Sequence, residues 1–132
     1  MQVNGVAISV VRLAGYDYTQ TAADIAMFEG AVLGSTNSTV YAAQGAGTAG
    51  GWGDALAAAP LSAKNSAAIL LTEGPTQGVG SYTNAVLKAA GTPPNGLGGG
   101  ITSGIQVLGG PFAVPQSQIT EMQASLAGGA TA

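Results

Sequence analysis

The 132-residue chain contains no cysteine and no histidine. Without cysteine it can form neither a disulfide nor a thiolate metal site, and without histidine it lacks a frequent general base and metal ligand. A Ser–His–Asp triad is therefore excluded. The six carboxylates show no spacing typical of a calcium loop or of a paired acid–base site. We expect a protein that is not an enzyme and that uses no metal or other cofactor.

Charged residues are also scarce, since they make up 7% of the chain against about 25% in typical soluble domains. The cations are Arg12, Lys64 and Lys88, and the net charge is −3. Nucleic-acid binding requires several lysines or arginines on the phosphates, so we expect no nucleic-acid partner. Because surface charge keeps proteins apart in solution, so neutral a surface favours burial in an oligomer or a larger assembly.

Long apolar runs are missing too. No stretch of about 20 apolar residues occurs, so we expect no insertion into a membrane. The first residues, MQVNGVAISVVRLAG, have no basic n-region and too short an apolar run for a signal peptide. The sequence therefore predicts either synthesis without export or a mature segment.

Strand patterns alternate with helix patterns along the chain. The expected strands cover residues 6–13, 38–43, 66–72 and 105–110, and the expected helices cover 18–34, 55–64, 82–90 and 114–127. This alternation predicts an α/β fold: a single three-layer domain over residues 1–132 with a mainly parallel sheet flanked by helices. Residues 128–132 are expected to be a flexible tail, and residues 92–104 a loop.

Local signals suggest where the helices begin and bend. Thr19 or Thr21 is the candidate N-cap of the first helix, and Asp54 is that of the second. Pro60 is expected to bend or shorten this second helix. The apolar residues of the last helix fall on one face: Ile119, Met122 and Leu126.

Gly45-Ala-Gly47-Thr-Ala-Gly50 matches the G-x-G-x-x-G pattern of dinucleotide sites. Glu73 ends the next strand, where a ribose-binding acid would be expected. However, Gly51-Trp52-Gly53 follows the pattern, so the helix is expected to start too late, and Asp54 places a carboxylate where the pyrophosphate would lie. We therefore favour a structural loop and rank a dinucleotide-binding enzyme last.

Trp52 is the one tryptophan of the chain and lies in a glycine-rich loop. Two interpretations stay open for it. It could cover the edge of the sheet, or it could provide a platform for a sugar ring or a partner protein.

Three ordered segments make the chain similar to the bacterial cell wall-binding repeat type 2 family: RLAGYDYTQTAADIA (12–26), GWGDALAAAPLSAKNSAAILLTEG (51–74) and IQVLGGPFAVPQSQI (105–119). The family pattern has an Arg-x-x-Gly start leading to Thr-Ala, an aromatic-x-Asp-Ala-Leu segment, an Ile-Leu-Leu-Thr strand and a late Leu-Gly-Gly turn. The chain departs from it by lacking an arginine between Asp17 and Tyr18, and by carrying Ala68 where the family has proline.

The resemblance implies a non-catalytic α/β module that packs in threes and anchors surface proteins to anionic wall polymers. It implies that the Ile-Leu-Leu strand end and neighbouring loops form the binding edge. A lone repeat must then pack with copies of itself, so we expect a homotrimer. The residues expected to contact a polymer or partner are Arg12, Trp52, Asp54, Ile69, Leu70, Leu71 and Thr72.

Two non-enzymatic functions remain. In the first, the protein is a structural or decoration component outside a large assembly, namely a bacteriophage virion, where it docks on a virion or surface-layer protein and could touch the host cell surface. In the second, it is a cell-envelope module that binds an anionic wall glycopolymer. The missing signal peptide and missing arginine place the virion surface first and the cell envelope second.

Overall fold

The computed structural model describes residues 2–46, 51–90 and 104–130. Its centre is a parallel sheet with the strand order β4 (Ile69–Thr72), β3 (Thr39–Gln44), β5 (Gly104–Val107). Tyr41 lies beside Ile69 on one side of β3 and beside Gln106 on the other. The α/β prediction with a parallel sheet is therefore confirmed.

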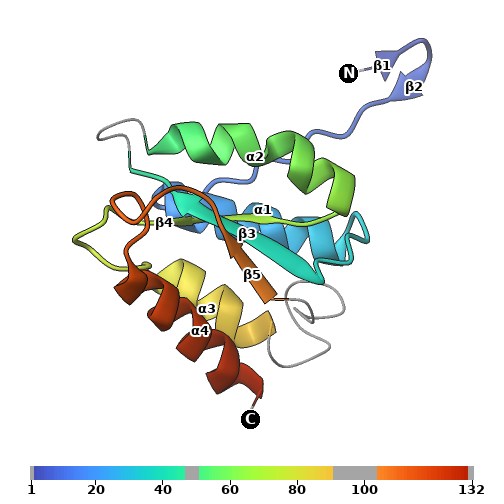
Figure 1. Ribbon diagram of the computed structural model, residues 1–132. Coiled ribbons are helices and arrows are strands. Elements are labelled where there is room, and N and C mark those ends of the chain that lie inside the picture. Colours follow the sequence, from blue (N-terminus) through green and yellow to red (C-terminus); the bar gives the residue numbers. More distant parts are fainter. Residues whose placement is uncertain (1, 47–50, 91–103, 131–132) are drawn as a thin grey trace.

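Helices cover both faces of this sheet (Figure 1). Helix α2 (Trp52–Asn65) lies over β3 on one face, while α3 (Ser81–Ala90) and α4 (Gln116–Ala130) pack together on the other. Helix α1 (Tyr18–Ala31) packs against β4 and α3. The connections between parallel strands run through helices, as such strands require.

The central strand β3 is buried on both faces, and its side chains alternate between them. Val40 and Ala42, both fully buried, join the apolar cluster shared with α1, α3 and α4. Tyr41 and Ala43 belong to the other set of alternating positions. The Tyr41 hydroxyl accepts a hydrogen bond of 2.7 Å from Nδ2 of Asn65, the last residue of α2. This bond ties the end of α2 to the sheet.

The N-cap of α1 is Asp17, so the expectation of Thr19 or Thr21 is wrong. Its Oδ1 accepts from the Gln20 backbone N–H at 2.9 Å and from the Thr19 hydroxyl at 2.7 Å. The Thr21 hydroxyl donates to the Asp17 carbonyl oxygen at 2.8 Å and accepts from the Gly15 N–H at 3.0 Å. Thr19 is buried. Both threonines hydrogen-bond to the capping residue Asp17, but neither is the N-cap.

Helix α2 begins earlier than the sequence indicated. Gly51 is the N-cap, and Trp52, Gly53 and Asp54 form the first turn, so Asp54 is not the cap. A carboxylate in the first turn is still favourable because it faces the positive end of the helix dipole. Pro60 lies inside the helix, which nevertheless continues to Asn65.

The strand expected over residues 6–13 is wrong. Strand β2 covers only Val6–Ala7 and pairs with β1 (Gln2–Val3) around Asn4-Gly5, both of which have positive φ. Asn-Gly is the strongest short signal for such a tight hairpin. Residues 8–15 follow without regular structure. A β-branched run describes side chains suited to a pleated, half-buried surface, and it forms a strand only where a partner strand is available.

At the other end, α4 continues to Ala130, so residues 128–130 are helical and not part of a tail. Most of the loop expected at 92–104, and residues 131–132, lie outside the described residues; Gly104 begins β5. None of the helices in the described ranges has the length and hydropathy needed to cross a lipid bilayer.

Helix α4 also holds the loop that follows β4. Nε2 of Gln118 donates to the carbonyl oxygens of Gly74 and Gly78 at 3.0 and 2.8 Å. Oε2 of Glu121 accepts from the Val79 N–H at 3.3 Å, and Gln118 is only 1% exposed. Side chains of α4 therefore satisfy backbone groups that the tight turn leaves without partners.

We expect Asp17→Ala to lower the midpoint of thermal unfolding by a few degrees, because the Gln20 N–H and Thr19 hydroxyl lose their acceptor. Asp17→Asn retains an acceptor oxygen and loses less. Those two hydrogen bonds lower the pKa of the Asp17 carboxyl below its ordinary 3.8. The stabilisation by the charged form is therefore present above pH 3.8 and is lost as the pH falls through the lowered pKa.

Melting curves of Asp17→Asn and the wild type from pH 7 to pH 2 check this expectation. The difference between the two proteins should shrink below about pH 4. A difference that stays constant over the whole range would show that the charge of Asp17 plays no part in capping.

Candidate functional site

The carboxyl ends of the three strands define the first candidate region. The chain passes from β3 to β4 on one side and then to β5 on the other, so the order of strands reverses beside β3. Ligands of open α/β sheets bind outside the carboxyl ends of the strands at such a reversal. In Figure 1 these ends lie at the left, together with the beginning of α2. We call this region the carboxyl edge.

The first turn of α2 is fixed against this edge. A Cβ on Gly51 would collide with the side-chain oxygen of Gln44, the last residue of β3, whose side chain is buried. A Cβ on Gly109 would lie 2.6 Å from Oδ2 of Asp54, and Gly109 has a φ of +106°. The turn after β5 therefore lies close to the Asp54 carboxylate, and its positive φ favours glycine at this position. The fold thus brings Asp54 and Gly109, which lie in separate segments of the sequence, close together.

Three exposed aromatic residues belong to segments that lead into or out of the carboxyl edge. Trp52, the first residue of α2, is 57% exposed, and Phe112, just after the Gly109 turn, is 94% exposed. Tyr16, which directly precedes the cap of α1, is 91% exposed. Aromatic faces that remain in water at a binding edge are suited to stacking on a planar or apolar face of a ligand. This arrangement agrees with the platform interpretation of Trp52.

Tyr18 belongs to the same edge but is packed more closely. Its ring leaves no room for a Cβ on Gly45, which would lie 2.5 Å from ring atom Cδ2. Burial raises the pKa of the Tyr18 hydroxyl, and the nearby carboxylates of Glu73 and Asp17 raise it further. The hydroxyl therefore stays protonated and can donate a hydrogen bond at neutral pH.

The second candidate region is a groove of about 240 Å³ over β4, between α1 and α2. Ile69 and Leu71 form its floor, since alternate residues of a strand face the same side. The other lining residues come from the two helices: Ala22, Ile25, Glu29, Ala55 and Ser62. We call this the β4 groove. Partial burial raises the pKa of the Glu29 carboxyl above its ordinary 4.5.

The seven residues expected from the sequence are thus not equivalent. Leu70 and Thr72 are fully buried on the opposite side of β4, where they cannot touch a polymer. Trp52 and Asp54 share the first turn of α2 with Ala55, which lines the β4 groove, so the groove adjoins the carboxyl edge. Arg12 is exposed, and no hydrogen bond or ion pair joins it to another described residue.

Sequence reasoning missed Glu29, Tyr16 and Phe112. Glu29 looked like a solvated helix residue, because nothing in the sequence shows that α1 lies beside β4. Phe112 could have been found, because a large aromatic after Gly-Gly inside a loop has no apolar pattern around it to bury it.

The glycine pattern can be judged only in part. Residues 47–50 lie outside the described ranges, whereas the Tyr18 ring fills the space beside Gly45. Among the described residues, no group of three or more acidic side chains is placed to hold a metal ion.

A family model described as cell wall binding domain 2 matches residues 12–119. The match includes α1, β3, α2, β4, α3, β5 and the beginning of α4, and it leaves the β1–β2 hairpin outside. No curated protein and no solved structure matches the chain significantly.

We expect Gly109→Ala to destabilise the protein by about 2 kcal/mol, because alanine is strained at this φ and meets the Asp54 carboxylate. Gly110→Ala is the matched control, since a Cβ at Gly110 has no atom within 4 Å. Urea unfolding of both variants measures the difference. Adding Asp54→Ala to Gly109→Ala should recover the steric part of the loss. Equal stabilities of Gly109→Ala and Gly110→Ala would contradict the close approach.

Proposed function

The chain belongs to the cell wall binding domain 2 family, and from this membership we propose that it is a non-catalytic module of the bacterial cell envelope that binds an anionic wall glycopolymer. The observation that carries the proposal is the match over residues 12–119, which contains both the carboxyl edge and the β4 groove. This is the function that the sequence analysis ranked second.

The family match does not favour the function ranked first, decoration of a bacteriophage virion. A cell wall binding domain belongs to the envelope or the cell surface, and the description of the family names no virion component. The family is a binding domain by description, which agrees with a non-catalytic function.

The chemistry of the β4 groove suits a sugar chain. Ile69, Leu71 and Ile25 offer an apolar floor and wall for the C–H faces of a ring, and Trp52 stands exposed one turn from Ala55 at the groove. Binding pockets for small organic ligands are mostly apolar with a few polar groups that fix orientation. A ring stacked on Trp52 with its neighbour over Ile69 and Leu71 would use both candidate regions at once.

Electrostatics add little to this binding. The chain has three cations and a net charge of −3, and Glu29 contributes a carboxyl to the groove itself. An anionic polymer is therefore not attracted by the field of the whole protein. We propose that ring contacts supply most of the binding free energy, with Arg12 as an exposed cation for one anionic group of the polymer.

Trp52→Ala should reduce retention on purified bacterial walls roughly five- to tenfold, since a lost stacking contact is worth about 1 to 1.5 kcal/mol. The matched control is Leu56→Ala, because Leu56 is 67% exposed on the same helix and lines neither candidate region. A pull-down with a dilution series of walls gives both values. Equal retention of the two variants would remove Trp52 from the site, and failure of the wild type to bind any wall preparation would overturn the proposed function.

Glu29→Gln should increase retention at neutral pH, because it removes a negative charge from the β4 groove. In the wild type, retention should rise as the pH falls through the raised pKa of Glu29, since protonation removes the same charge. The variant should lack this component of the pH profile. Asp24→Asn, on the same helix but outside the groove lining, serves as the control of equal charge. Identical pH profiles for Glu29→Gln and the wild type would contradict a polymer seated in this groove.

A further inference from the structure

Residues 6–11, which we call the arm, are apolar, and their side chains are exposed in the described part of the chain, although the backbone of Val6–Ala7 pairs with β1. Their sequence is Val-Ala-Ile-Ser-Val-Val, without a charge. Val6, Val10 and Val11 are 67%, 81% and 61% exposed. In Figure 1 the arm and the β1–β2 hairpin extend beyond the helices and lead away from the sheet. A charge-free β-branched segment held in water is unusual, because such side chains are normally buried.

Strand β5 has an open edge. Its inner side pairs with β3, and no described strand pairs with its outer side, whereas α1 packs beside β4 at the other end of the sheet. The sequence of β5, Gly-Ile-Gln-Val, contains neither a charge nor a proline. Those are the devices by which proteins usually protect an edge strand from pairing. The backbone groups of β5 are thus available to another strand.

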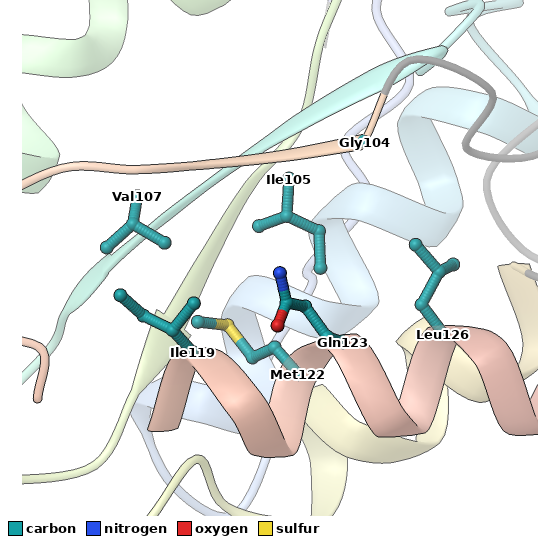
Figure 2. Close-up of a pocket in the computed structure, with 7 residues that line it drawn as sticks. All are labelled: Gly104, Ile105, Val107, Ile119, Met122, Gln123 and Leu126. Carbon is teal, nitrogen blue, oxygen red and sulfur yellow. The ribbon is translucent and has the colours of Figure 1, made fainter. Parts of the chain in front are cut away.

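A groove of about 260 Å³, lined by apolar side chains and by the amide of Gln123, runs between β5 and α4 next to this edge. Figure 2 shows Ile105 and Val107 of β5 facing Ile119, Met122 and Leu126 of α4 across it. Ile105 and Val107 are only partly buried, although they lie on the core side of the sheet. The apolar face expected on the last helix is therefore present, since Ile119, Met122 and Leu126 all line this groove.

We propose that the arm of one copy of this chain adds as a further strand to the β5 edge of a second copy. In an extended arm, Val6, Ile8 and Val10 fall on one face, which can cover the groove beside Ile105 and Val107. Six extended residues span roughly 20 Å, enough to pair with all four residues of β5. Arm, edge and groove carry no charged residue, so nothing in the contact is left as an unpaired charge.

A second copy fits this contact better than the chain's own edge. The segment after the arm enters α1, which packs beside β4, and the arm points away from the sheet in Figure 1. The donor segment and the acceptor edge are different surfaces, so the contact is head-to-tail and can close into a ring. The inference does not depend on what the β4 groove binds.

The absence of native cysteine permits a direct test with two single-cysteine variants. Ser9→Cys places a thiol in the arm and Gln106→Cys places one on β5; both residues are exposed, and both alternate with the apolar positions that would cover the groove. Mixing the two proteins under mild oxidation should give a disulfide-linked pair. Ser9→Cys mixed with Ala59→Cys, at an exposed position on α2, is the control and should cross-link far less.

Light scattering of the wild type and of an Ile8→Asp, Val10→Asp double variant completes the test. The wild type should have an oligomeric mass and the double variant a monomeric one that still folds, with an unchanged far-ultraviolet circular dichroism spectrum, because neither residue belongs to the core. A wild-type monomer would overturn the proposal. So would equal cross-linking to Gln106→Cys and Ala59→Cys, or a cross-link that forms only within one chain carrying both Ser9→Cys and Gln106→Cys. Wall retention is measured separately, so failure of polymer binding leaves this result unaffected.

Discussion

Close packing of small side chains around β3 is the constraint on which the rest of the structure depends. Ala42 and Ala43 of β3 are fully buried, and the helices around the sheet contribute further buried alanines: Ala23, Ala26 and Ala58. Methyl groups let helix and strand backbones approach closely, and such interiors tolerate little change in volume. The positions of α1 and α2 over β4 follow from this approach, and with them the shape of the β4 groove.

The α/β class, the parallel sheet and the last three strands could be predicted because their signals are local. Apolar runs of strand length alternate with helical spacing, and β3 is buried on both faces. The first strand could not be predicted, because most of the β-branched run, from residue 8 onward, has no partner strand beside it among the described residues. The β-propensity of a segment describes that segment alone, whereas a strand forms only when a second segment pairs with it.

The candidate site was predictable only to the level of segments. Trp52 and Asp54 could be placed at the start of a helix, but the contact between Asp54 and Gly109 depends on the order in which the strands assemble. The side chains of Ile69–Thr72 alternate between the β4 groove and the core. The sequence alone does not show which of them face the groove, because that depends on which elements cover each face of the strand. Glu29 enters the site through helix packing alone.

The hydrogen bonds from α4 to the loop after β4 limit where the chain can be truncated. The family match stops at residue 119, which retains Gln118 but removes Glu121 and the buried Met122. A fragment trimmed to the matched range would keep every residue of the pattern while releasing Val79 and opening the floor beneath β5. The C-terminal boundary of a folded fragment is therefore set by the contacts between α4 side chains and the backbone of the loop after β4, and recombinant fusions of this module need that helix complete.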